Sequence, residues 1–119
     1  MRGLIAASIL LLSLPLTAAE TDMAAAGAAL DNPASQLLDV RSADEFASGA
    51  LPGAKRIEHS QIAAQITSVV PDKDTVIVLY CRSGRRSSMA QDSLADLGYR
   101  NVINGGGYDE LSAALEQQQ

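Results

Sequence analysis

Short apolar segments along the chain predict strands, and the most apolar of them defines the centre of the fold. Residues 75–80 form a β-branched run without polar alternation, which is typical of a central parallel strand buried on both faces. Residues 36–40 and 101–103 predict two further short strands. We expect these strands to lie in one sheet.

Helices separate the predicted strands. The alanine-rich residues 21–32 predict a first helix that stops before Pro33. Ser42 and Glu45 have the spacing of a capping box, so a second helix begins there, and Gly49 ends it soon afterwards.

The second half of the chain continues this alternation. Apolar residues at helical spacing predict a helix that follows residues 81–87, with Ala90, Leu94 and Leu97 along one side. The other expected segments are a helix over residues 60–70, a glycine-rich loop at 104–107 and a final helix over 108–117. This alternation predicts an α/β domain, in which helices flank both faces of a small, mostly parallel central sheet.

Residues 1–19 have the order of a secretory signal peptide. Arg2 gives a basic start, residues 4–16 are uncharged and leucine-rich, and residues 17–19 are small, as a signal peptidase requires. The apolar run is too short for a membrane-spanning helix, and no cysteine stands near the cleavage site to carry a lipid. We expect cleavage after Ala19, export to the periplasm, no stable membrane anchor, and a single domain over residues 20–119.

Composition and charge restrict the partners. The 119 residues include 14 acids and 9 bases, and the net charge of −5 argues against a nucleic-acid or anionic-membrane binder. Cys81 is the only cysteine and His59 the only histidine, so a disulfide within the chain and a cysteine-rich zinc site are both excluded. His59 precedes a predicted helix, far in sequence from Cys81, and we expect a surface or capping role for it. We expect a monomer that needs no metal and no cofactor.

Cys81 has the position expected of a reactive residue. It follows the strand over residues 75–80, and ligands of open parallel sheets bind at the carboxyl ends of the strands. Backbone N–H groups of a bent loop, a helix N-terminus and guanidinium groups all favour an anion, so we expect a lowered Cys81 pKa and a thiolate. The plainer alternative is a small buried hydrophobe beside solvated arginines. The residues predicted to bind substrate are those that follow it: Arg82, Ser83, Gly84, Arg85, Arg86 and Ser87.

Several motifs, in order and spacing, resemble the rhodanese (sulfurtransferase) family. They are residues 38–41 (Leu-Asp-Val-Arg), 45–46 (Glu-Phe), 49–54 (Gly-Ala-Leu-Pro-Gly-Ala), 81–87 and 106–108 (Gly-Gly-Tyr). The resemblance implies the rhodanese-like fold and a persulfide on Cys81, held by the backbone amides of its own loop. It further implies transfer of a sulfane sulfur, from thiosulfate or a similar donor, to a thiol or cyanide acceptor. Ala50 stands where the family often has histidine, and Tyr108 where it has tryptophan.

Loop length separates this chemistry from its main alternative. Related phosphatases place an arginine one residue farther from the cysteine than Arg86 lies from Cys81. The shorter loop favours a sulfur atom over a phosphate group. A phosphatase or arsenate-reductase-like enzyme, or a non-catalytic sulfur-carrying module, remains the alternative.

The charged residues of the motifs receive separate roles. Among the loop arginines, Arg86 is our first choice for direct contact with the donor and Arg82 the second. Asp39 and Arg41 lie at the carboxyl end of a predicted strand, where we expect them to support the site by ordering the neighbouring loops.

Overall fold

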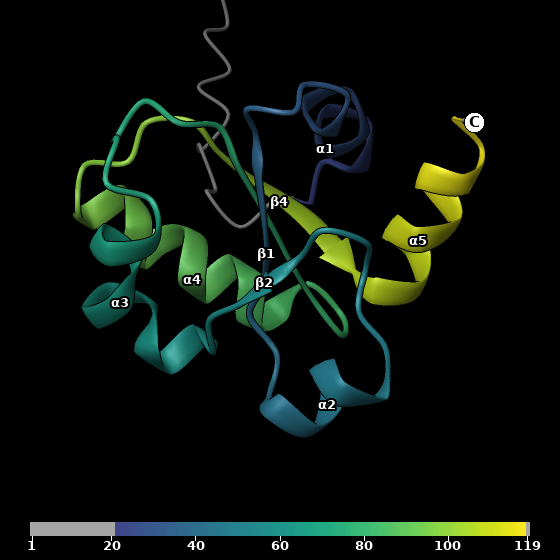
Figure 1. The fold of residues 1–119 in the computed structure, drawn as a ribbon, viewed down its shortest axis with the longest axis horizontal. Coiled ribbons are helices and arrows are strands. Elements are labelled where there is room, and N and C mark those ends of the chain that lie inside the picture. Colours follow the sequence, from purple (N-terminus) through teal and green to yellow (C-terminus); the bar gives the residue numbers. More distant parts are fainter. Residues whose placement is uncertain (1–20, 119) are drawn as a thin grey trace, which may run out of the picture.

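A four-stranded, all-parallel sheet runs through residues 21–118, the part of the chain that this computed structural model describes (Figure 1). The strand order is β2-β1-β3-β4, and each neighbouring pair is parallel. The strands are β1 (Gln36–Asp39), β2 (Lys55–Arg56), β3 (Ile77–Cys81) and β4 (Val102–Gly107). β3 lies between β1 and β4 and all its residues are buried, which confirms the prediction of a central strand. The predicted signal peptide, residues 1–19, lies outside the described residues.

Helices cover both faces of the sheet, as predicted. They are α1 (Met23–Leu30), α2 (Ala43–Ser48), the 3-10 helix η1 (His59–Gln61), α3 (Ile62–Val69), α4 (Arg85–Asp96) and α5 (Tyr108–Glu116). Figure 1 shows α3 and α4 on one side of the sheet and α1 and α5 on the other. Within residues 21–118, every helix is too short or too polar to span a bilayer.

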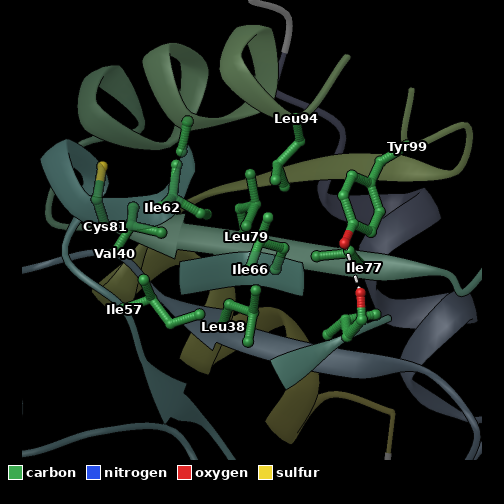
Figure 2. Close-up of a cluster of buried hydrophobic side chains, with 12 residues drawn as sticks. Leu38, Val40, Ile57, Ile62, Ile66, Ile77, Leu79, Cys81, Leu94 and Tyr99 are labelled. Atoms are coloured by element: carbon green, nitrogen blue, oxygen red, sulfur yellow. Dashed lines mark hydrogen bonds between the residues drawn. The ribbon is translucent and has the colours of Figure 1, made fainter. Parts of the chain in front are cut away.

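The side of the sheet under α3 and α4 carries the larger core (Figure 2). Leu38, Ile66, Ile77 and Leu94 are all fully buried there. Burial of each such side chain contributes about 1.5–3 kcal/mol to folding. Cys81 lies at one end of this cluster and Tyr99 at the other. The sulfur therefore lies buried at one end of a packed apolar layer.

Local chemistry fixes the start of α2 as predicted. Ser42 Oγ accepts a hydrogen bond from the N–H of Glu45 at 3.3 Å, and the Glu45 carboxylate accepts one from the N–H of Ser42 at 3.2 Å. Both halves of the capping box are present, which confirms this helix start.

The structure corrects the expectation that residues 104–107 form a loop. They belong to β4, and their glycines allow a close approach that a side chain would block. A Cβ at Gly105 would lie 2.9 Å from Leu111 Cδ2 and 3.1 Å from the Leu79 carbonyl oxygen. Glycines in this strand therefore permit packing rather than mark its end.

Two helix details also differ from the sequence pattern. α4 begins at Arg85, not after Ser87, because Gly84 takes a left-handed conformation (φ 94°) and turns the chain directly into the helix. Leu97 is 37% exposed, so it does not join Ala90 and Leu94 in the core. The sequence analysis did not predict β2, because a strand of two residues is too short to show a hydrophobic pattern.

Candidate active site

Cys81 is the last residue of β3 and lies just before the N-terminus of α4. Its exposed fraction is 0%. Neighbouring strands meet it at the same edge of the sheet, since Cys81 pairs with Gly107 of β4 beyond a register shift. The site therefore lies at the carboxyl ends of parallel strands, where such sheets bind ligands.

Neutral donors surround the sulfur. The N–H of Gly84 donates to Cys81 Sγ at 2.9 Å, and Ser87 Oγ lies 3.5 Å from the same atom. Burial acts to raise the pKa of the Cys81 thiol, but the Ser87 hydroxyl and the backbone N–H groups of Ser87, Ser83 and Gly84 outweigh it, so the net pKa lies below its ordinary value. We call Ser83, Gly84 and Ser87 the cradle.

Gly84 is the residue on which the cradle's shape depends. Its φ of 94° is costly for any other residue, and a Cβ there would lie 3.4 Å from Gly106 Cα and 3.3 Å from Thr21 Oγ1. Its carbonyl oxygen accepts from the N–H of Ser88 at 3.0 Å and from Ser88 Oγ at 2.9 Å. These bonds fix the Gly84–Arg85 peptide at the start of α4, while the N–H on the other side of the Gly84 Cα meets the sulfur.

The loop arginines differ in what they contact. Arg86 donates to both carboxylate oxygens of Glu45, at 2.7 and 2.9 Å. Hydrogen bonds from Arg86 and from Ser42 lower the pKa of Glu45 to about 2, although partial burial acts to raise it. Arg82 and Arg85 are exposed, and within residues 21–118 neither side chain makes a hydrogen bond or ion pair. We call Arg82, Arg85, Arg86 and Glu45 the charged rim.

The Glu45–Arg86 pair was not predicted. Sequence analysis assigned Glu45 to the capping box and Arg86 to the donor, whereas the structure joins them across 41 positions of the chain. The short Cys81-to-Arg86 spacing placed Arg86 near the sulfur but gave no sign of its partner.

Asp39 and Arg41 form a buried pair at the end of β1. Arg41 Nη2 lies 2.7 Å from Asp39 Oδ2, and the same nitrogen donates to the Gly49 carbonyl at 2.6 Å. The Arg41 guanidinium also stacks over the Tyr108 ring, 4.7 Å from its centroid. The pair thus links the end of β1, the segment after α2 and the start of α5. Among the described residues, neither side chain of the pair forms a hydrogen bond with Cys81.

A shallow cavity of about 330 Å³ opens beside the loop. Arg41 and Arg82 bring positive charge to it, Glu45 and Asp109 bring negative charge, and Tyr108 forms an aromatic wall. Within residues 21–118, no group of three or more His, Cys, Asp or Glu side chains comes together to ligate a metal. Arg82, the residue after Cys81, lines this cavity, whereas Cys81 itself does not.

Comparison with known proteins supplies the family. The sequence profile of the rhodanese-like domain matches residues 22–114. The chain belongs to the rhodanese-like family. This confirms both the resemblance and the α/β fold expected from it.

Two individual relatives of this rhodanese-like chain are named sulfurtransferases. It is 31% identical to thiosulfate sulfurtransferase PspE of Escherichia coli (strain K12) over 93% of this chain and 91% of that protein. It is 37% identical to a sulfurtransferase of Allochromatium vinosum over 57% of this chain and 62% of that protein. These relatives support sulfurtransferase activity in the broad sense.

Solved structures of a rhodanese and of a sulfurtransferase have a fold similar to that of this chain. A rhodanese with anions from E. coli superposes with a TM-score of 0.63 at 32% identity, covering 65% of this chain and 91% of that one. The human single-domain sulfurtransferase TSTD1 gives 0.62 at 28% identity, covering 72% and 88%.

Proposed function

We propose that this rhodanese-like chain is a thiosulfate sulfurtransferase that carries the transferred sulfur as a persulfide on Cys81. The observation that carries the proposal is the cradle. N–H and O–H donors meet a buried sulfur, and they favour its anionic form without a metal or a general base.

The reaction has two displacements. The Cys81 thiolate attacks the outer, sulfane sulfur of thiosulfate, a new S–S bond forms, and sulfite leaves with the electron pair of the broken S–S bond. An acceptor thiolate or cyanide then attacks the outer sulfur of the persulfide, and the Cys81 thiolate leaves. The cradle stabilises the Cys81 thiolate, which attacks in the first step and leaves in the second.

The charged rim brings the donor to the sulfur. Thiosulfate is a dianion, and Arg82, the residue after Cys81, is exposed on the cavity with no ion-pair partner among the described residues. Because Cys81 has no exposed surface, the atoms that cover it must move aside before the donor reaches Sγ. We therefore assign capture to Arg82 and place Arg85 and Arg86 around the approach.

The Glu45–Arg86 pair bears on the phosphatase alternative. Arg86 is bound to a carboxylate at 2.7 Å instead of completing a ring of donors over the sulfur. A phosphate group would have to displace Glu45 to reach that guanidinium. This observation favours sulfur transfer over phosphate hydrolysis.

Export is part of the proposal. Residues 1–19 carry the signal-peptide pattern, so we propose a periplasmic monomer without a stable membrane anchor, acting on a small-molecule donor and a thiol acceptor. N-terminal sequencing of the protein from a periplasmic fraction tests this, and we expect the chain to begin at Glu20. An uncleaved chain retained in the cytoplasm would contradict it.

The activity is tested with purified protein in three parallel assays. We expect thiocyanate to form from thiosulfate and cyanide, and aryl phosphate to remain intact. Hydrolysis of the phosphate would establish the phosphatase alternative. If neither reaction occurred, while the folded protein accepted sulfur from a partner protein, the chain would be a sulfur carrier and not an enzyme for thiosulfate.

A further inference from the structure

Asn104 lies in β4 behind the cradle, and every polar atom of its side chain is engaged. Its Oδ1 accepts from the Ser87 hydroxyl at 2.7 Å and from the N–H of Gly106 at 2.9 Å. Its Nδ2 donates to Ser88 Oγ at 2.8 Å and to the Gly84 carbonyl at 3.2 Å. Because the Gly106 N–H can only donate, it keeps Oδ1, and not Nδ2, turned toward Ser87.

The Ser87 hydroxyl has one proton and three acceptors in reach. They are Asn104 Oδ1 at 2.7 Å, the Gly84 carbonyl at 3.0 Å and Cys81 Sγ at 3.5 Å. The Gly84 carbonyl already accepts from the Ser88 N–H, from Ser88 Oγ and from Asn104. The effective competition for the Ser87 proton is therefore between Asn104 and the sulfur.

We propose that Asn104 is a positioning residue that competes with Cys81 for the Ser87 hydroxyl, so that Ser87 donates to the sulfur while Sγ is anionic and to Asn104 when it is not. A charged acceptor attracts a hydroxyl proton more strongly than an amide oxygen does. When Sγ is neutral, the shorter contact to Asn104 holds the proton. Asn104 thus acts on the sulfur only through Ser87.

This competition has a place in the catalytic cycle, which rests on the proposed function. In the free enzyme the Ser87 hydroxyl donates to the thiolate. Once the Sγ–S bond has formed and sulfite has left, the negative charge lies on the outer sulfur, and the hydroxyl turns back to Asn104 Oδ1. No proton leaves Ser87 in either arrangement, so only a hydrogen bond is exchanged.

The charges around Cys81 come from other elements and stay constant in the test. β4 itself has no titratable residue. Arg86 on α4 interacts with the Cys81 charge and carries its partner Glu45, Arg82 follows Cys81 directly, and the Asp39–Arg41 pair ends β1. Two acids of other segments already lie close to β4: the N–H of Asp22 donates to the Asn104 carbonyl at 2.8 Å, and Glu110 Oε2 lies against Gly107. Both are unchanged in the variants, so an acid at position 104 adds one charge to a constant background.

Two substitutions are expected to shift the Cys81 titration in opposite directions. Asn104→Asp places a carboxylate that attracts the Ser87 proton and repels the thiolate, so the midpoint rises by about one pH unit. Asn104→Ala removes the competing acceptor, so Ser87 donates to the sulfur throughout and the midpoint falls by about half a pH unit. The ultraviolet absorbance of the thiolate, measured against pH with Cys81→Ser as the blank, reports both shifts. Cys81 is the only cysteine, so the signal has one source.

Asn101→Asp and Asn101→Ala are the matched controls. Asn101 is exposed just before β4, and its amide donates to the Asp74 carbonyl at 2.8 Å, so the same changes there should leave the titration unmoved. Shifts in the same direction for both Asn104 variants, or no shift in either, would show that Asn104 only packs the loop. If the Asp variant does not fold, the sign of the Ala variant alone decides. The titration needs no donor, so it gives its answer even if the proposed thiosulfate activity is absent.

Discussion

The cradle and the charged rim handle the same negative charge in opposite ways. Gly84 and Ser87 are buried and uncharged, and they meet the sulfur with fixed N–H and O–H donors. Arg82 and Arg85 are exposed cationic side chains, and neither forms a hydrogen bond with the sulfur. A cation buried beside Cys81 would lose its hydration, and this desolvation costs free energy even when no substrate is bound. Neutral N–H and O–H dipoles stabilise the thiolate without burying a second full charge. The difference assigns stabilisation of the anion to the cradle and capture of the donor to the rim.

Removal of the sulfur should have the largest effect. Cys81→Ser should abolish sulfur transfer, because no second cysteine can form the persulfide, while the thermal melting temperature changes little. Thiocyanate formation and circular dichroism on the same sample measure both. More than trace activity in this variant would show that Cys81 does not carry the transferred sulfur, so neither the cradle nor the charged rim would act on it.

Distortion of the cradle should come next. Gly84→Ala forces a Cβ into the left-handed region, beside Gly106, and should lower kcat more than tenfold by moving the N–H away from the sulfur. Gly53→Ala is the control, because Gly53 also has a positive φ (81°) but open space where its Cβ would lie. Both variants should lose about 1 kcal/mol of stability from backbone strain, and only the Gly84 variant should lose activity. Equal kinetics in the two would mean that cradle geometry is unimportant.

Neutralising the rim should affect the KM for thiosulfate rather than kcat. We expect Arg82→Ala to raise KM several-fold without loss of stability, since its side chain is unpaired among the described residues. Arg86→Ala should also weaken thiosulfate use and, in addition, lower stability by about 1 kcal/mol through loss of the Glu45 pair. Raised salt should mimic the Arg82 variant by screening the donor. A change confined to kcat would place Arg82 in the cradle's role instead.

The smallest effect concerns pH and stability. The Glu45 pKa is lowered to about 2 from an ordinary value of 4.5, so its stabilisation is complete above about pH 4.5 and is lost as the pH falls toward 2. Glu45→Gln should therefore lower the free energy of unfolding by about 1 kcal/mol at pH 7. The difference in free energy of unfolding between the variant and the parent protein should become smaller as the pH falls toward 2. Asp44→Asn, in the same first turn of α2 but exposed, is the control and should cost less. Urea unfolding across this pH range gives the comparison, and a constant difference at all pH values would argue against the ion pair.

Elements with a local cause were predictable from the sequence. The apolar run of β3 and the Ser42–Glu45 capping box are each explained by residues a few positions apart. Features that depend on residues far apart in the chain were not predictable. β4 passes close to Leu79 and Leu111 where a side chain at Gly105 would clash, and Arg86 is held by a residue of α2.

The candidate site was likewise predictable only where its residues are close together in the sequence. Cys81 and its loop were predicted because strand, cysteine, glycine and helix follow one another directly. Asn104 was placed in a loop, since its four hydrogen bonds reach residues 2 to 20 positions away and leave no local pattern. The one sequence signal for Asn104 is its position immediately before three glycines.

The intact mass of the protein after thiosulfate treatment shows whether Cys81 becomes a persulfide. We expect the purified chain to gain the mass of one sulfur atom, the gain to map to Cys81, and cyanide to remove it as thiocyanate. The Cys81→Ser variant should gain nothing. An unchanged mass in the parent, or a gain that persists in the variant, would contradict a persulfide on Cys81.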